Sequence, residues 1–394
     1  MISFVSLTKE RSPVASFQKF AAGFEIVPED FAVRPITTGF LHRSYCLTHE
    51  KNGAKYVLQR LSPIFDLQAI NTNLNLFEKA QAKSHSFLPE YWQKVYYLDV
   101  SGSKNKIYYD EERNAWRAMV HVPGEIRVFN SFSEVPEGKR EEVAYSLGEA
   151  IAIFGKILAT KVDQGQWQEP LPNFHDPVYH YKYLQSILNK EEVPLSLSHD
   201  KRKKVRLDGK LKEDEELKDR CGRLVAKIDR MGHLVSALDD LGTAVTHGDL
   251  KINNAVFRRD KEGKWRCVAL IDLDTIQRGG VLDDLGDALR SAGNPAGEQP
   301  ASLDLVTIDK LIVQRLIDGF IDKTAEFYDP IRAEELRKYT LKAYAQFLYV
   351  QAIRFFADFL VGNRYFKLKE GERGDLNLYR AEVQMKALEE LEKL

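Results

Sequence analysis

The sequence predicts an α+β fold in two lobes, a β-rich lobe over residues 1–122 and a larger helical lobe over residues 123–394. Runs with the apolar alternation of strands are concentrated before residue 122. The Pro123-Gly124 pair then indicates a change of chain direction, which we interpret as a hinge. From Glu141 onward, apolar residues recur at helical spacing. A chain of 394 residues is long enough for each lobe to have its own core.

The first lobe is predicted to be a small sheet, with helices at Val14–Gly23 and Leu67–Ala82. The Asn52-Gly53 pair is a strong hairpin signal, because tight hairpin turns need residues that tolerate positive φ. The expected strands, in chain order, are Phe31–Gly39, Ser44–Thr48, Lys55–Leu61, Val95–Val100, and either Tyr108-Tyr109 or Trp116–Val122.

The second lobe is predicted to be mainly helical. Val143, Leu147, Ile151 and Phe154 fall on one helix face. The other expected elements are helical segments at Leu184–Leu188, Leu217–Leu241 and over most of Ser302–Leu394, and one short strand pair, Ala255–Phe257 with Val268–Ile271.

Charge dominates the segment Lys190–Arg220. The basic run Lys201–Lys204 is followed closely by the acidic run Glu213–Glu216. We interpret the segment as a solvated insertion between helices, because charge runs are usually exposed. A patch for an anionic partner is the alternative, and the mixed charge speaks against it.

The composition is that of a soluble globular protein, with 44% hydrophobic and 29% charged residues. A net charge of −1 gives no global field that would recruit nucleic acid or an anionic membrane. Cys46, Cys221 and Cys267 match no zinc or disulfide spacing, which fits a reducing cytoplasm. No secretory leader or membrane-spanning run is visible. We therefore expect a cytoplasmic protein with a small-molecule partner.

The loop Thr246–Asn254 and the strand end Ala269–Thr275 hold the most informative residues. Phosphoryl transfer needs a carboxylate that receives the proton of the attacking hydroxyl, oxygen ligands for Mg²⁺, and a cation near the phosphates. We predict that Asp249 is the catalytic base and that Asn254 and Asp272 bind Mg²⁺. A lone loop Asp is usually a turn or cap residue, but these partners favour the functional interpretation.

The sequence leaves the roles of three neighbouring residues open. Asp274 lies on the same side of the extended strand end as Asp272, so it is predicted to be a second metal ligand, a substrate contact or a capping residue. Lys251 is close enough to Asp249 to neutralise a γ-phosphate, although an exposed loop Lys is common. His247 is predicted to hold the loop through a backbone hydrogen bond, because phosphoryl transfer asks for only one proton acceptor.

In the first lobe, the turn Gly39–Tyr45 is where a kinase would cover the phosphates of ATP. Gly39, Arg43 and Ser44 are the candidate contacts, and an ordinary hairpin is the alternative, since one glycine is a weak signal. A kinase usually carries a lysine on the third strand, but the alternation places Gln59 there.

Adenine is expected against the backbone near His121 and Val122. The β-rich lobe, the hinge and the helical lobe with its acidic loop form a two-lobed protein-kinase-like layout, with an ATP cleft between the lobes.

These residues resemble the aminoglycoside phosphotransferase/choline kinase superfamily of small-molecule kinases. The likeness extends from about Ile36 to Glu390, without the charged insertion. Within the superfamily, the N-acetylhexosamine 1-kinase branch is the most similar, through the segments Gly39–Tyr45, Tyr56–Arg60, Asn173–Asp176, Asp284–Arg290, Arg354–Leu360, Tyr365–Lys367 and Asn377–Ala381.

The resemblance implies ATP-dependent phosphorylation of the anomeric hydroxyl of an N-acetylhexosamine, with Arg354 and Tyr365 contacting the sugar. From the sequence alone, Arg354 is an arginine on an apolar helix, which needs either an ion pair or a cleft. The branch also has Gln where other kinases have the strand lysine. Two departures leave the acceptor open: Gly248 stands where the branch often has Asn, and the last tryptophan is Trp265, so a late Trp against the sugar is missing.

Two alternatives remain. The first is a kinase for an amino alcohol or aminoglycoside, which would need an acidic or aromatic pocket for the cation. The second is a catalytically inactive nucleotide-binding protein, against which the full set of base and metal ligands speaks. A protein kinase is disfavoured, because no Ala-Pro-Glu follows the Asp272 strand and no multi-glycine loop is present.

Overall fold

A computed structural model describes residues 24, 30–36, 42–162, 166–189, 193–194, 204–205 and 214–394. The chain forms two compact units, one of Met1–Pro63 with Val95–Val122 and the other of Ile64–Lys94 with Pro123–Leu394. The first is β-rich and the second mainly helical, so the predicted α+β kinase-like fold class is confirmed. Residues 64–94, which the sequence suggested for the first lobe, lie in the second unit.

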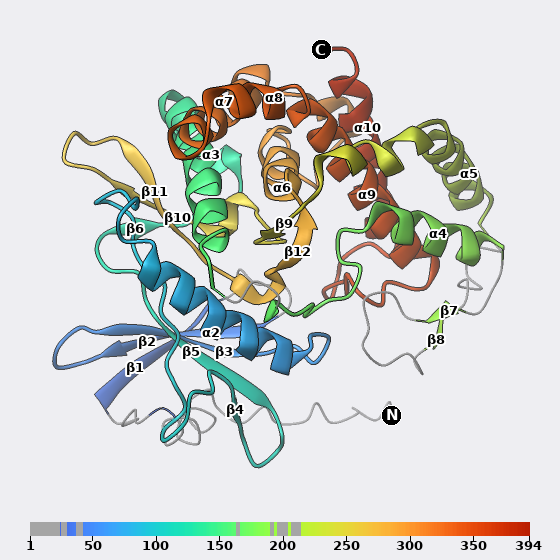
Figure 1. Ribbon diagram of the computed structural model, residues 1–394. Coiled ribbons are helices and arrows are strands. Elements are labelled where there is room, and N and C mark those ends of the chain that lie inside the picture. Colours follow the sequence, from blue (N-terminus) through green and yellow to red (C-terminus); the bar gives the residue numbers. More distant parts are fainter. Residues whose placement is uncertain are drawn as a thin grey trace, which may run out of the picture. The chain divides into compact units, whose positions relative to one another are not determined.

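The first unit is built on a five-stranded antiparallel sheet in the order β1-β2-β3-β5-β4 (Figure 1). The Asn52-Gly53 turn closes the β2–β3 hairpin, and Gly53 has the positive φ of 71° that the pair predicts. The strands are β1 (Phe31–Ile36), β2 (Arg43–His49), β3 (Lys55–Arg60), β4 (Tyr108–Tyr109) and β5 (Ala115–Val120).

The two faces of this sheet differ in character. One carries the core of the unit, in which Leu47, Leu58 and Trp116 are buried together with Phe24. Because side chains alternate along a strand, the neighbouring residues of β2, β3 and β5 lie on the opposite face. That face is the one that carries Gln59.

One predicted strand of this unit is wrong. Val95–Val100 forms no strand and makes only an isolated bridge, between Tyr97 and Met119. The reason is a turn that follows at once, in which Val100 donates its N–H to the carbonyl of Asn105 and Gly102 has a φ of 73°. Both segments that the sequence offered as alternatives are strands, β4 and β5. The helix expected at residues 14–23 lies outside the described residues.

The second unit is dominated by helices, and most begin at an Asp that accepts hydrogen bonds from the first turn, as Asp66 does for α2. The helices are α2 (Leu67–Lys83), α3 (Arg140–Leu158), α4 (Pro177–Leu188), α5 (Glu215–Arg230), α6 (Asp283–Ala292), α7 (Lys310–Phe327), α8 (Pro330–Arg337), α9 (Thr340–Leu360) and α10 (Leu376–Leu391).

Two helix pairs pack most extensively in this unit, α3 with α7 and α9 with α10, and α6 lies between them (Figure 1). The backbones of α3 and α7 approach so closely that a Cβ on Gly148 would lie 2.1 Å from the carbonyl oxygen of Leu316. Helix α9 is buried along most of its length, which explains its nearly continuous apolar sequence.

The second unit also contains more strands than predicted. The expected pair is present as β10 (Ala255–Arg259) and β11 (Trp265–Leu270), joined by β6 (Ile126–Arg127). A further pair, β9 (Thr243–Thr246) with β12 (Gln277–Gly280), was not expected. β12 is polar and ends in two glycines, so it has little strand propensity of its own and depends on its pairing with β9.

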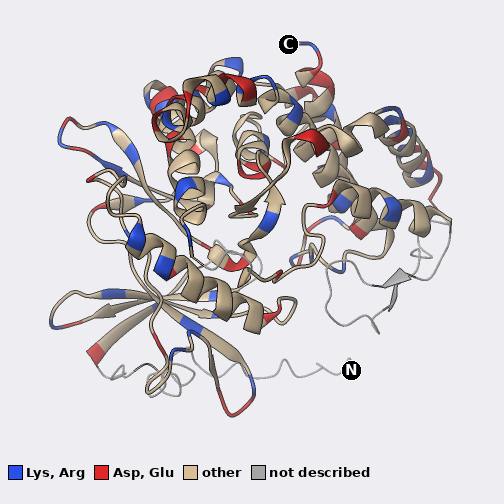
Figure 2. Cartoon of the chain, in the orientation of Figure 1, with Lys and Arg blue, Asp and Glu red and all other residues tan. Residues whose placement is uncertain are grey.

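The charged segment Lys190–Arg220 falls largely outside the described residues, apart from the short strands β7 (Val193–Pro194) and β8 (Lys204–Val205) and the start of α5. Acidic and basic residues are interspersed along α5, α7 and α8 (Figure 2), and some form ion pairs, such as Arg337 with Asp318 at 2.8 Å. Among the described helices, none is long and apolar enough to cross a membrane.

Candidate active site

The loop after β9 is held by a carboxylate from another element. Asp284, in the first turn of α6, accepts hydrogen bonds from the backbone N–H groups of His247 at 2.8 Å and Gly248 at 3.0 Å. Asp284 is buried, and burial raises the pKa of its carboxyl group. These two bonds fix the direction in which the chain presents Asp249.

Gly248 and His247 fit this loop for different reasons. Gly248 has a φ of 83°, and a Cβ at this position would lie 2.4 Å from the carbonyl oxygen of Thr275, so only glycine fits. The His247 ring is hydrogen-bonded on both sides, through Nε2 to the carbonyl of Ile271 at 2.9 Å and through Nδ1 to the N–H of Asp249 at 3.3 Å. The predicted structural role of His247 is confirmed.

Asp249, Lys251 and Asn254 are brought together as the sequence predicted. Lys251 Nζ lies 3.0 Å from Asp249 Oδ1, and Asn254 donates its amide N–H to the Asp249 carbonyl at 2.7 Å. The Asn254 amide oxygen therefore points away from Asp249. Burial alone would lower the pKa of Lys251, but the nearby carboxylates of Asp249, Asp287 and Glu298 raise it.

The strand end after β11 places two carboxylates side by side. Asp272 has a left-handed backbone, with a φ of 65°, and begins the short 3₁₀ turn that contains Asp274. A carboxylate oxygen of Asp272 lies within 4.8 Å of one from Asp274. Asn73 of α2 steadies this turn by donating to the carbonyl of Ile276 at 2.7 Å.

These donors fit a magnesium ion. Asp272 and Asp274 supply charged oxygens and Asn254 a neutral one, and Mg²⁺ prefers hard oxygen ligands of this kind. The segment is a left-handed residue and a 3₁₀ turn, not the extended strand end that the sequence suggested, yet the carboxylates of Asp272 and Asp274 lie close together. The arrangement can hold one cation with two charges, whose partners would be phosphate oxygens.

Two further buried groups surround the loop. His175 hydrogen-bonds through Nε2 to the carbonyl of Gly248, and burial lowers the pKa of His175 to about 4, so the ring is neutral at neutral pH. Asp287 of α6 pairs with Arg290 at 2.8 Å. Burial opposes ionisation of Asp287, but the Arg290 guanidinium holds the pKa of Asp287 below its usual value.

Arg354 of α9 lies in an aromatic enclosure in the same unit. Its guanidinium carbon is 4.5 Å from the Phe174 ring centre, 5.9 Å from that of Tyr365 and 5.6 Å from that of Phe366. The Arg354 guanidinium donates one hydrogen bond to Gln351, at 3.0 Å, while the buried Nε of Arg354 has no partner among the described residues. Burial lowers the pKa of Arg354, which means that its charge is poorly solvated.

The segment that carries Tyr365 is fixed by hydrogen bonds to side chains of α9 and α10. Asp358 of α9 accepts hydrogen bonds from the backbone N–H groups of Tyr365 at 2.7 Å and Phe366 at 2.9 Å. Asn377 of α10 donates to the Phe366 carbonyl at 2.8 Å. These hydrogen bonds fix the backbone of the segment after α9, and this keeps Tyr365 beside Arg354.

The candidate nucleotide residues of the first unit are placed by its sheet. Ser44 and Gln59 pair across β2 and β3, while Arg43 is exposed at the start of β2. His121 and Val122 follow β5, and the His121 N–H donates to the carbonyl of Lys55 at 3.0 Å. Burial lowers the pKa of His121. Gly39 lies outside the described residues.

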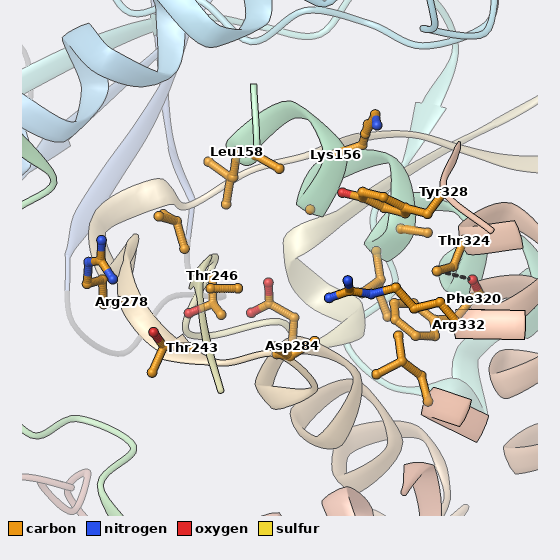
Figure 3. Close-up of a pocket in the computed structure, with 18 residues that line it drawn as sticks. Lys156, Leu158, Thr243, Thr246, Arg278, Asp284, Phe320, Thr324, Tyr328 and Arg332 are labelled. Carbon is orange, nitrogen blue, oxygen red and sulfur yellow. Dashed lines mark hydrogen bonds between the residues drawn. The ribbon is translucent and has the colours of Figure 1, made fainter. Parts of the chain in front are cut away.

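The second unit also has a partly open cavity of about 360 Å³. Figure 3 shows Thr246 and Asp284 on one of its walls, and Tyr328 and Arg332 on the other. Asp249, Asn254 and Asp272 are not among its lining residues in the described part of the chain. The cavity therefore does not include the proposed base and metal ligands, although Thr246 at the start of their loop and Asp284, which holds that loop, line it.

Sequence reasoning missed Asp284 and His175 as parts of this site, and both lie far from Gly248 along the chain. A signal existed for Asp284, since Asp284 and Asp287 stand three apart on α6 and therefore share a helix face. Two carboxylates on one buried helix face need partners, and backbone N–H groups are the commonest.

Comparisons with known proteins identify the family of this chain and proteins of similar fold. Residues 32–305 match the model of the phosphotransferase enzyme family. The fold is similar to that of a Plasmodium vivax ethanolamine kinase, with 12% identity over 94% of this chain and 86% of that chain and a TM-score of 0.52. It is also similar to a spectinomycin phosphotransferase solved with ADP and spectinomycin, with 12% identity over 96% of this chain and 98% of that chain and a TM-score of 0.55.

At this identity the two structures show the fold alone, whereas the family model covers more than half of the chain. The chain thus belongs to the phosphotransferase enzyme family and is a kinase that transfers phosphate to a hydroxyl group of a small molecule.

Proposed function

We propose that this kinase transfers the γ-phosphate of ATP to a sugar, namely the anomeric hydroxyl of an N-acetylhexosamine. The observation that carries the choice of acceptor is Arg354. A buried guanidinium with a free Nε–H beside aromatic rings suits a ligand that offers oxygen atoms and a flat apolar ring face. An acetamido oxygen and a pyranose ring have these two properties.

The same group disfavours cationic acceptors. Choline, ethanolamine and aminoglycosides bring positive charge, and a like charge next to poorly solvated Arg354 costs free energy that water cannot screen. The aromatic rings around Arg354 already make cation–π contacts with its guanidinium, so they are not available to a cationic acceptor. A neutral sugar avoids this repulsion, and this supports the sugar over the amino alcohol.

In the proposed mechanism, Asp249 orients the acceptor hydroxyl toward the γ-phosphate and takes its proton late in the step. Lys251, at 3.0 Å, keeps the Asp249 carboxylate in place and contributes positive charge near the transferred group. His175 is neutral and does not compete for the proton. Asp284 keeps the loop in this orientation through the N–H groups of His247 and Gly248.

Mg²⁺ would be held by Asn254, Asp272 and Asp274 and would neutralise charge on the phosphates when bound. These residues do two things without it: they leave the Asn254 oxygen free of Asp249 and bring the two carboxylates within 4.8 Å. Replacing Asp272 by Ala is expected to abolish the Mg²⁺ dependence of nucleotide binding, measured by titration calorimetry. Metal-dependent binding that persists would remove Asp272 from the ligand set.

ATP would contact the first unit through Arg43, Ser44 and Gln59 at the phosphates, and through His121 and Val122 at the adenine. Gly39 belongs to the same proposed group. The exposed position of Arg43 and the sheet face that carries Ser44 and Gln59 support this assignment.

The test is ADP release with ATP and Mg²⁺ over a panel of N-acetylhexosamines, neutral hexoses, choline, ethanolamine and aminoglycosides. We expect turnover with an N-acetylhexosamine and none with the cationic acceptors. Turnover with choline or an aminoglycoside alone would overturn the sugar assignment. Nucleotide binding without turnover on any acceptor would favour an inactive nucleotide-binding protein.

A further inference from the structure

In the first unit, two of the proposed nucleotide residues lie next to Arg117, a buried residue to which the proposed function gives no role. The strand register places Ser44 of β2 opposite Gln59 of β3, and Gln59 opposite Arg117 of β5. All three side chains are therefore on one sheet face, opposite to the apolar core of the unit. Gln59 occupies the strand position at which kinases usually have the lysine that contacts the ATP phosphates.

Hydrogen bonds join the three residues in one direction. Arg117 Nη2 donates to Gln59 Oε1 at 2.6 Å, and Gln59 Nε2 donates to Ser44 Oγ at 3.3 Å. A guanidinium has donors only, so it forces the oxygen of the Gln59 amide toward itself and turns the amide N–H₂ outward. The Tyr97 ring, 4.9 Å from the guanidinium carbon, stacks on Arg117 and restricts its plane.

The three residues differ in how deeply they are buried. Arg117 is 0% exposed, whereas Gln59 and Ser44 are half-buried. A ligand on this face therefore meets the Gln59 amide and not the guanidinium. The bond from a charged donor polarises the amide, and this makes its N–H₂ a stronger donor toward an anion. A cation one residue deep still contributes its field, because little water lies between to screen it.

We propose that Arg117 is a positioning residue for the nucleotide phosphates, which orients and polarises Gln59 so that the Gln59 amide N–H₂ donates to a phosphate oxygen. The pair replaces the missing strand lysine: Gln59 makes the contact and Arg117 supplies the charge. This inference rests on the proposed function, because it requires that ATP bind to this face of the sheet.

The experiment compares the binding of MgATP and of adenosine by titration calorimetry in the full-length protein. Adenosine has no phosphates, so it reports on the fold and the adenine contacts alone. In Arg117→Met we expect the dissociation constant of MgATP to rise by about tenfold to a hundredfold, the range for loss of a charge-assisted contact, with adenosine affinity unchanged. In Gln59→Lys/Arg117→Met the lysine stands at the strand position itself, and MgATP affinity should recover.

Two variants sharpen the result. Gln59→Glu keeps a partner for Arg117 but presents only acceptors to the phosphates, so it should fold and lose MgATP affinity while keeping adenosine affinity. Arg60→Met is the matched control, since Arg60 follows Gln59 on β3 and its guanidinium is bonded to Asn114. Its loss should leave both affinities unchanged.

The outcomes separate the two claims. If the wild-type protein binds neither MgATP nor adenosine, the proposed function fails and the inference falls with it. If the wild type binds both, the inference alone is overturned by MgATP affinity that is unchanged in Arg117→Met and Gln59→Glu. An equal loss of MgATP and adenosine that Gln59→Lys does not rescue would likewise overturn it, because Arg117 would then only support the fold.

Discussion

Replacing Asp284 by Asn should slow catalysis although Asp284 touches no reacting group. The wild-type carboxylate accepts one N–H on each oxygen, from His247 at 2.8 Å and from Gly248 at 3.0 Å. Asn keeps the shape but has one acceptor oxygen, and its N–H₂ group would face the second N–H. One backbone donor of the catalytic loop is then buried without a partner, next to another donor.

The magnitude follows from these two bonds. A hydrogen bond to a charged group contributes about 1.5–3 kcal/mol, and an unsatisfied buried donor costs about 1–3 kcal/mol. We therefore expect the free energy of unfolding to fall by about 2–4 kcal/mol. If half of this, about 1–2 kcal/mol, appears as displacement of Asp249 in the transition state, the turnover number falls by about fivefold to thirtyfold.

The assay is steady-state ADP release, with urea unfolding of the same preparations. Asp283→Asn is the matched control, because neighbouring Asp283 is also buried but its Oδ2 accepts one N–H, from Gly280 at 2.8 Å, which an Asn oxygen can replace. The control should keep its turnover number. An Asp284→Asn enzyme that turns over like the wild type would refute the role of Asp284.

Three further predictions concern the second unit. Gly248→Ala should abolish most activity, because its Cβ would lie 2.4 Å from a carbonyl oxygen. The control Gly242→Ala also has a positive φ, of 76°, but open space around it, so it should lose only stability. Equal losses of activity in kinetic assays would contradict this prediction. Burial raises the pKa of Asp283 to about 7, above its unfolded value, so the stability that protonated Asp283 contributes is present at low pH and is lost as the pH rises through 7. In urea unfolding from pH 5 to 8, the wild type should therefore lose stability relative to Asp283→Asn. Equal pH dependence of the two proteins would contradict this prediction. Arg354→Gln should raise the KM for the sugar while leaving the KM for ATP unchanged, and a shift in the ATP value alone would remove Arg354 from the acceptor site.

Local signals in the sequence predicted much of the fold. The Asn52-Gly53 pair marked the β2–β3 hairpin, and helical periodicity located α3 because its buried face repeats over several turns. The prediction of a strand at Val95–Val100 was wrong, because apolar and polar residues alternate in the same way in a strand and in an extended segment that leads into a turn. The β9–β12 pair was missed because β12 is stabilised by its partner and not by its own residues.

The candidate site divides in the same way. Asp249, Lys251 and Asn254 lie within six residues, so their spacing alone showed that they would meet. Asp284 reaches the loop from 36 residues away, and no periodicity reports such a contact. The alternation along β3 predicted that Gln59 stands at the position of a kinase lysine, and the register places Gln59 opposite Ser44 of β2 and Arg117 of β5.

What the Gln59 side chain faces depends on the register with β5, which only the fold supplies. The sequence therefore predicted a glutamine in place of the kinase lysine, but it did not reveal that Arg117 lies next to this glutamine.

The central claim is that Asp249 directs phosphate from ATP to the anomeric hydroxyl of an N-acetylhexosamine. The most direct measurement is ³¹P NMR of the product formed from ATP, Mg²⁺ and N-acetylglucosamine or N-acetylgalactosamine, with wild-type protein and with Asp249→Asn. We predict a sugar phosphate whose phosphorus is coupled to the anomeric proton in the wild type, and almost none with Asp249→Asn, which should still bind ATP. Phosphate on another hydroxyl, no sugar phosphate at all, or equal product from both proteins would contradict the account.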